Sequence, residues 1–330
     1  MDRREFLKRS LAAAGGLALG GLWPRLAKAE EEPSRVALVR NSALAEADDD
    51  TANRLLRSMT LVAIADAVGA PDAGSAMRKL FKPDDIVGIK LNCIAPQMAP
   101  CPAVVYAVVE ALGYAGVQRT NMIIFDKEDR DLAAAGYTCT ATGDGPLVFG
   151  TVGETRNSGY EARFTEEGDT SFCLSKIVTR ECTALINIPV IKQHSFSGMT
   201  CALKNHFGCI HNPEDFHYQD GCNPAVADVN KTPAIRTKQR LCVCDAFNVQ
   251  YEGGPSYNAK YVEFYGGVLA STDPVALDAE AMLIVDAFRQ KNSLKPLKDL
   301  ERPPKHIATA ARYGPGCDDP QRIQLVVRSV

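Results

Sequence analysis

Short apolar runs rich in β-branched residues alternate with segments of helical hydrophobic period along most of the chain. A short apolar run between turn residues is typical of a buried strand, whereas apolar positions three and four apart predict a helix. Strands are predicted at 36–39, 86–91, 122–125, 185–191, 240–245, 267–270 and 323–327, and helices at 51–68, 74–81, 103–112, 128–136, 174–182, 224–229, 274–289 and 307–312. This alternation predicts an α/β fold with a mixed, mainly parallel sheet and helices on both faces.

Residues 86–125 read as strand, helix and strand, which predicts a parallel pair joined by a right-handed crossover. The segment 138–170 is rich in Gly, Thr and charged residues, and we expect loops or a hairpin there. No stretch reads as a linker between independent domains. We therefore expect one large α/β domain over residues 30–330.

The stretch 183–217 contains four of the five histidines and organises the candidate chemistry. Asn187 and Pro189 interrupt its apolar run, which suits a strand near the edge or end of a sheet. Lys192 and His194 follow at alternate positions and should share one face of that strand.

Helical spacing is predicted to resume after residue 198. Thr200 and Lys204 would then lie on one face of a helix that stops near Gly208. The free N–H groups at the start of such a helix, with Lys192 and Lys204 beside them, predict a site for an anion.

Polar residues also follow the other predicted strands. Ligands of open α/β sheets bind beyond the carboxyl ends of the strands, so these residues are candidates for one site. Asp273 precedes Pro274 and is better explained as a helix cap, and the alternative for the whole set is a series of unrelated surface residues. The set comprises Lys90, Asn92, Asp126, Lys192, His194, Asp245 and Asp273.

The downstream end of the stretch holds the densest group of possible metal ligands. Imidazole and thiolate suit zinc or iron, although the spacing is not that of a recognised zinc motif and the alternative is a polar rim. His217 is instead a candidate general acid or base, and His306 is expected to be structural and away from the motifs. The metal candidates are His206, Cys209, His211 and Cys222.

The amino terminus predicts export by the twin-arginine route. Arg3 and Arg4 precede an apolar segment at 11–23 and a small-residue cleavage site at 27–29. That segment is shorter than a membrane helix, so we expect residues 1–29 to be a cleaved signal, with an uncleaved tether as the alternative. The expected partner during export is the twin-arginine translocase, and the expected compartment is the periplasm, with no stable membrane span after cleavage.

Charge and cysteine content narrow the function classes. Without residues 1–29 the chain has 31 Lys and Arg against 38 Asp and Glu, which does not favour nucleic acid as a partner. The eleven cysteines include no run with ferredoxin spacing, so core thiols, disulfides and a metal site all stay open.

Five segments together resemble the family catalogued as domain of unknown function number 362. Many members carry an added ferredoxin segment and are described as iron–sulfur proteins, but this chain has no such segment. The resemblance covers roughly residues 84–285, and it implies a fold and a site without an established reaction. The segments are VGIKLN at 87–92, INIPVIKQHSFSGMTCALKNHFG at 186–208, ADVNKTPAIRTKQRLCVCDAF at 227–247, EGGP at 252–255 and STDPVALDAEA at 271–281.

Two functional hypotheses follow. The first is an exported enzyme for a small carboxylate or phosphate, and one version of it draws an analogy to lactate-racemase-like enzymes with a Lys/His-rich cofactor cleft. The alternative is a periplasmic protein that binds a metal or redox cofactor without catalysis of its own. In the first hypothesis the catalytic residues are His194, His217 and Lys192, and the substrate-binding residues are Lys90, Asn92, Thr200, Lys204 and Asn205.

Overall fold

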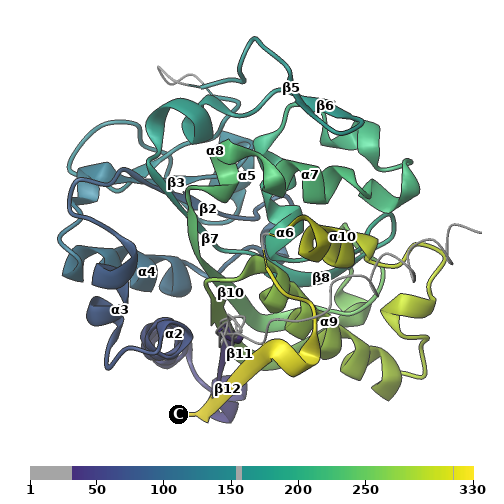
Figure 1. Ribbon diagram of the computed structural model, residues 1–330. Helices are drawn as coiled ribbons and strands as arrows, with labels where there is room; N and C mark the ends of the chain where they lie inside the picture. The colour runs from purple at the N-terminus through teal and green to yellow at the C-terminus, as the bar shows by residue number, and fades with distance from the viewer. Residues whose placement is uncertain (1–31, 154–157, 315) are drawn as a thin grey trace, which may run out of the picture. The chain divides into compact units, whose positions relative to one another are not determined.

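A computed structural model describes residues 32–153, 158–314 and 316–330. Within these residues, one ten-stranded sheet runs in the order β12-β1-β11-β10-β7-β2-β3-β4, and β8 and β9 extend it from β10 (Figure 1). The predicted export signal at 1–29 lies outside the described residues. The strands are β1 (Ser34–Arg40), β2 (Val87–Lys90), β3 (Met122–Phe125), β4 (Leu147–Val148), β7 (Ala184–Asn187), β8 (Val190–His194), β9 (Gly198–Thr200), β10 (Gln239–Gln250), β11 (Val262–Ser271) and β12 (Ile323–Ser329).

The predicted mixed and mainly parallel sheet is confirmed. Parallel pairing joins β1 to β12, β10 to β7 and β8, β2 to β7 and β3, and β3 to β4. Antiparallel pairing joins β11 to β1 and β10, and β8 to β9. The parallel neighbours β2 and β3 are connected through the helix α4 (Pro102–Tyr114), as the strand, helix and strand pattern predicted. A hairpin of β5 (Thr165–Glu167) and β6 (Thr170–Phe172) forms a separate small sheet.

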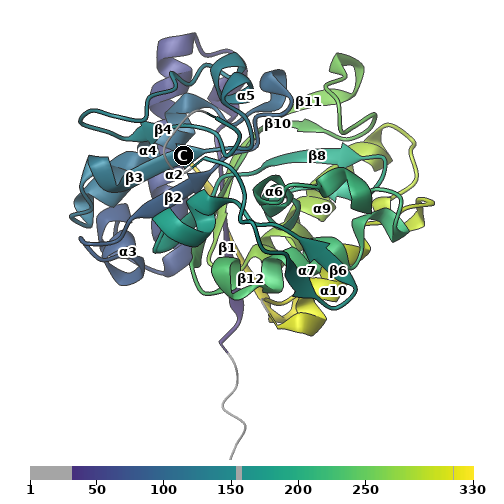
Figure 2. The same cartoon turned by 90° about the horizontal axis from the view of Figure 1, so that it is seen from above.

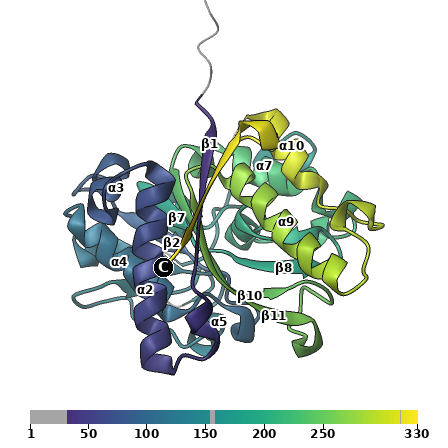
Figure 3. The ribbon, with the colours of Figure 1, turned by 90° about the horizontal axis from the view of Figure 1, so that it is seen from below.

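Helices cover both faces of the main sheet (Figures 2 and 3). The inner strands are buried on both faces; in β1, Val36 and Leu38 face one core while Ala37 and Val39 face the other. This two-sided burial explains why the strands read as continuous apolar runs. One face carries α2 (Asp49–Val68), α3 (Ala73–Leu80) and α4 (Pro102–Tyr114), and the other carries α6 (Ala202–Asn205), α7 (Ala225–Lys231), α9 (Pro274–Lys291) and α10 (Lys305–Tyr313).

Two short helices and two helix ends complete the architecture. The helix α5 (Asp129–Ala134) follows β3, and α8 (Pro233–Arg236) precedes β10. Asp48 caps the start of α2, and Gly69 ends it in the left-handed conformation with a φ of 62°. Among the described residues, no helix is both long and apolar enough to span a bilayer.

The predicted single strand at 185–191 is two strands, and β7 is not at the edge of the sheet. β7 pairs with β10 on one side and β2 on the other, and its last contact with β2 is the bond from the N–H of Ile188 to the carbonyl of Lys90. Pro189 lies between β7 and β8, where its missing N–H costs no ladder bond. From there β8 follows β10 and leaves β2, so the sheet forks.

The predicted helix start at 198–200 is wrong. Gly198 to Thr200 form β9, which folds back on β8 and places Thr200 opposite Lys192. Gly198 has a φ of +77°, and a Cβ there would lie 2.5 Å from the backbone nitrogen of Pro304. Thr200 and Lys204 therefore do not share a helix face, because α6 begins only at Ala202.

The start of α6 is occupied by a carboxylate from α9. Asp278 is fully buried, and its two oxygens accept hydrogen bonds from the N–H groups of Ala202 at 2.6 Å and Leu203 at 3.1 Å. The predicted anion site at this helix start is therefore filled by the protein itself. Only the lysine part of the predicted anion site remains.

Two amides hold the other backbone groups of this four-residue helix. The side chain of Asn187 donates to the carbonyl of Ala202 at 2.8 Å, and that of Asn230 donates to the carbonyl of Leu203 at 2.8 Å. Both amides are buried. Side chains from β7, α7 and α9 thus fix α6, and with it the positions of Lys204 and Asn205.

Candidate functional site

A cavity of about 350 Å³ opens where β2, β3 and β8 end. It brings together all eight residues predicted as catalytic or substrate-binding. Asp126, from the strand-end set, also lines it. The predicted residues in the cavity wall are Lys90, Asn92, Lys192, His194, Thr200, Lys204, Asn205 and His217.

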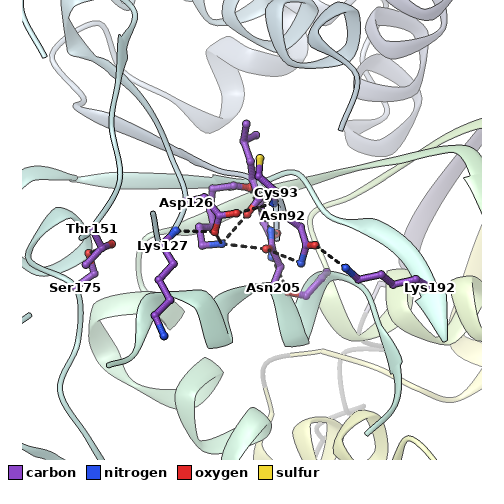
Figure 4. Close-up of polar contacts among 12 residues, drawn as sticks. Asn92, Cys93, Asp126, Lys127, Thr151, Ser175, Lys192 and Asn205 are labelled. Carbon is purple, nitrogen blue, oxygen red and sulfur yellow. Dashed lines mark hydrogen bonds and ion pairs between the residues drawn. The ribbon is translucent and has the colours of Figure 1, made fainter. Parts of the chain in front are cut away.

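Lys90 forms the buried floor of the cavity. Its ammonium group donates to Asp126 Oδ1 at 2.6 Å, to the carbonyl of Leu91 at 2.6 Å and to Asn205 Oδ1 at 3.1 Å (Figure 4). These bonds use all three of its protons. The second oxygen of Asp126 accepts the N–H of Cys93 at 2.6 Å. Lys90 is thus a satisfied structural cation, and it is not free to bind substrate.

Gly208 is placed over this ion pair for reasons of space. A Cβ at this position would lie 2.8 Å from Lys90 Nζ and 3.3 Å from Asp126 Oδ1. The predicted helix stop at Gly208 is wrong, because the residue lies inside the 3₁₀ turn His206–Cys209. A side chain here would fill the cavity floor.

Amides connect the floor to Lys192. The Nδ2 of Asn205 donates to Asn187 Oδ1 at 2.7 Å and to the carbonyl of Lys90 at 3.2 Å. The Oδ1 of Asn92 accepts from Lys192 Nζ at 3.2 Å. Figure 4 shows the resulting chain of polar contacts, with Asp126 on one side of the two amides, Asn92 and Asn205, and Lys192 on the other.

Lys192 and Lys204 are buried without a carboxylate partner among the described residues. Their exposed fractions are 2% and 7%. Lys204 Nζ lies 4.3 Å from the ring centre of Phe207. Burial lowers the pKa of Lys192 to about 8, with the charge of Asp126 opposing this shift, and burial also lowers the pKa of Lys204. The contrast with the paired Lys90 is the main electrostatic feature of the cavity.

His194 is arranged as a neutral hydrogen-bond donor. Its Nδ1 accepts the N–H of Phe196 at 3.1 Å and that of Ser197 at 3.4 Å, so the ring proton of the neutral form is on Nε2. Burial, followed by the charge of Lys204, lowers the pKa of His194 to about 2. This environment favours donation from Nε2 over uptake of a proton.

His217 lies beside His194 and is half-buried. Its ring stacks on Phe196 at 5.1 Å with an interplanar angle of 10°, and its centre is 5.4 Å from that of His194. Burial, followed by the charge of Lys204, lowers the pKa of His217 to about 4, so the ring is neutral near pH 7. The neutral ring can accept a proton, although its lowered pKa makes it a weaker base than an ordinary imidazole.

Residues 87–282 match the family described as Domain of unknown function (DUF362), which is more than half of the chain. The chain belongs to the DUF362 family. The matched region runs from β2 into α9 and includes all eight predicted cavity residues.

Comparison with other proteins adds little to the family assignment. No curated protein matches this DUF362 chain. A solved structure, the lactate racemase apoprotein from Thermoanaerobacterium thermosaccharolyticum, is similar to it with 9% sequence identity and a TM-score of 0.41. The similarity covers 73% of this chain and 55% of the racemase chain, so the chain spans about half of that protein's length.

The four predicted metal ligands of the DUF362 chain do not converge. His206 is buried with Nδ1 2.8 Å from Asn230 Oδ1, and His211 Nδ1 accepts the N–H of Cys173 at 3.0 Å. Cys209 and Cys222 are buried, and Cys222 lies near Lys204. Within residues 32–153, 158–314 and 316–330, no group of three His, Cys, Asp or Glu side chains is arranged to hold a metal ion.

Three other predicted positions have clear environments. Asp273 caps α9, as predicted, by accepting the N–H groups of Val275 and Ala276. Asp245 is not in the cavity; it accepts the N–H of Cys101 at 2.7 Å and lines a separate cavity beside α2 and α4. His306, which was predicted to be structural, is buried in α10, and burial, followed by the charge of Lys204, lowers its pKa to about 3.

Sequence reasoning missed most of the acidic side of the cavity. Glu128 and Asp131 follow Asp126 in the segment that leaves β3, and Glu214 comes from the turn before His217. The sequence did contain a signal for them. Asp126 was selected because ligands bind beyond the carboxyl ends of strands, and the same reasoning applies to the residues directly after it.

The two classes of buried lysine should respond in opposite ways to an isosteric neutral substitution. Lys90→Met leaves Asp126 as a buried carboxylate without a cation and should cost about 3 to 5 kcal/mol. Lys204→Met removes an uncompensated buried charge and should raise the free energy of unfolding, by on the order of 1 kcal/mol. Urea unfolding in buffer without multivalent anions measures both changes. A clear loss of stability in Lys204→Met would show that its charge supports the fold.

Proposed function

We propose that this chain is an enzyme that acts on a small anionic substrate, a carboxylate or a phosphate, bound in the cavity of about 350 Å³. The observation that carries the proposal is the pair of buried lysines, Lys192 and Lys204, which face this cavity without a carboxylate partner among the described residues.

The energetic argument rests on the cost of burying charge. An ammonium group removed from water is strongly disfavoured unless an anion compensates it. Lys90 has that compensation from Asp126 at 2.6 Å. A substrate anion would provide the equivalent for Lys192 and Lys204, so the free energy lost in the empty cavity would be recovered on binding.

The side chains have separate roles in this proposal. Lys192 makes one hydrogen bond, to Asn92, and has protons left for a ligand oxygen. His194 would donate from Nε2, and Thr200 lies opposite Lys192 in the β8–β9 hairpin. His217 would accept the proton that the reaction releases. The end of the cavity that carries Lys192 and Lys204 would be held in place by Lys90, Asn205 and Asn92. The alternative of a metal or redox carrier has no ligand cluster to support it in the described residues.

Anion binding should depend on the two unpaired lysines. Lys192→Met and Lys204→Met should each bind sulfate, phosphate, oxalate and malonate at least about tenfold more weakly than wild type, because each loses a charge-assisted hydrogen bond. Isothermal titration calorimetry measures the affinities. Lys231→Met is the matched control, since that lysine pairs with Glu167 at 3.1 Å outside the cavity.

Wild-type affinities in both cavity variants would contradict the proposal. NMR then measures whether the ligands that bind the wild-type protein are converted to a product. A ligand that binds through Lys192 and Lys204 but is never converted would identify a binding module in place of an enzyme.

Anion affinity should fall above about pH 8. The pKa of Lys192 in the empty protein is lowered to about 8, so the charged form is present below that pH and is lost above it. Sulfate keeps its charge over this range, and its affinity should decrease by up to about tenfold per pH unit. In Lys192→Arg the guanidinium stays charged, and the decrease should begin at a higher pH. An identical pH profile for both proteins would exclude Lys192 as the titrating group.

Export through the twin-arginine translocase into the periplasm is part of the same proposal. It rests on the leader at 1–29, outside the described residues. Arg3→Lys combined with Arg4→Lys should abolish appearance of the protein in the periplasmic fraction of a bacterial host, while Arg25→Lys should not. Equal periplasmic yields from the wild-type leader, the double variant and Arg25→Lys would contradict export by this route.

A further inference from the structure

The cavity has a second end, formed by the segment that leaves β3. Asp126, Glu128 and Asp131 line the cavity there together with Arg130. Figure 4 shows Asp126 on the opposite side of Asn92 and Asn205 from Lys192. The carboxylates and the unpaired lysines therefore approach a ligand from different elements, the β3–α5 segment and the β8–β9–α6 segment.

Charge is not balanced at this second end. Asp126 is neutralised by Lys90, and Glu214 lies 3.6 Å from Lys127. Glu128 and Asp131, in contrast, share one guanidinium, because Arg130 Nε is 2.6 Å from Glu128 and 3.5 Å from Asp131. The side chain of Arg130 is 77% exposed, so water screens this cation. One carboxylate thus lacks a cation of its own.

Asp131 is the carboxylate with the weaker partner. Its side chain is 23% exposed, and within the described part of the chain its only cation contact is the longer one to Arg130. Burial raises its pKa, and the charges of Glu128 and Asp126 raise it further. A ligand cation at this position would offset the effects of burial and of the two neighbouring carboxylates on the pKa of Asp131.

Two independent observations therefore describe opposite deficits in one cavity. Lys192 and Lys204, both more than nine-tenths buried, lack a carboxylate partner among the described residues, and Glu128 and Asp131 share one exposed cation, Arg130. Apolar side chains of Phe207, Pro213 and Pro255 line the same cavity and offer contact to a hydrocarbon segment. A volume of about 350 Å³ is at the small end for ligand sites.

We propose that the substrate is a small bipolar molecule, an amino carboxylate or an amino phosphate, whose anionic group binds Lys192 and Lys204 and whose ammonium group binds Asp131 and Glu128. This inference rests on the proposed anion site and specifies the other end of its ligand. It also explains how one cavity holds under-compensated groups of both signs, because a ligand with an anionic group at one end and an ammonium group at the other compensates both.

Matched ligand pairs test the ammonium subsite. The pairs are 4-aminobutyrate with butyrate, 5-aminovalerate with valerate, and phosphoethanolamine with ethyl phosphate. In wild type the amine-bearing member of at least one pair should bind about tenfold more tightly, which is the ratio expected for one charge-assisted contact. Calorimetric titration of the full chain measures each affinity.

Variants assign that advantage to Asp131. In Asp131→Asn the ratio within a pair should fall below about threefold, while the amine-free member should bind at least as well as in wild type. Glu128→Gln is a second variant, used if Asp131→Asn does not fold by circular dichroism. Glu167→Gln is the control, because this carboxylate pairs with Lys231 at 3.1 Å outside the cavity, and it should keep the wild-type ratio.

The outcomes separate this inference from the proposed function. Equal affinities within every pair, with binding still lost in Lys204→Met, would overturn the ammonium subsite and leave the anion site intact. An unchanged ratio in both Asp131→Asn and Glu128→Gln would also overturn it. No detectable binding of any anion to wild type would overturn the proposed function and this inference together.

Discussion

The carboxylate of Asp278 is the contact on which the site geometry depends. It takes the two N–H groups at the start of α6, a helix of four residues that is too short to hold itself together. With the amides of Asn187 and Asn230 on its carbonyl groups, α6 becomes a rigid part of the interior. This arrangement positions the backbone of Lys204, and its ammonium group lies 4.3 Å from the ring centre of Phe207.

The cavity combines groups that stabilise the fold with groups that cost stability. Lys90 and Asp126 compensate each other, and Asn205 and Asn92 have partners for their polar atoms. Lys192 and Lys204 are held in the same wall without a compensating carboxylate among the described residues. Such an imbalance of charge is expected where selection for ligand binding, and not for fold stability, determines which residue occupies a position. The neutral imidazoles of His194 and His217 fit this setting, because burial, followed by the charge of Lys204, lowers the pKa of both rings.

Sequence patterns predicted the helices and strands whose formation depends on residues that are close together in the sequence. The strand at 122–125 was found with its exact bounds because it is an isolated apolar tetrad. The helix predicted at 51–68 from its apolar spacing is α2, which begins at Asp49. The strand β9 was missed, since three residues carry no period and its conformation comes from pairing with β8. Asp278 at the start of α6 was unforeseeable for a similar reason: the two lie 76 residues apart, and only the packed fold brings them together.

Pro189 shows how a single backbone position creates room for chemistry. Pro189 lies between β7 and β8 and has no N–H group to donate. At this residue the chain keeps its pairing with β10 and ends its pairing with β2, so the sheet divides into two branches with polar side chains between them. The cavity therefore lies where the sheet loses one of its hydrogen-bonded neighbours. A change that restored continuous strand pairing at this point would close the cavity.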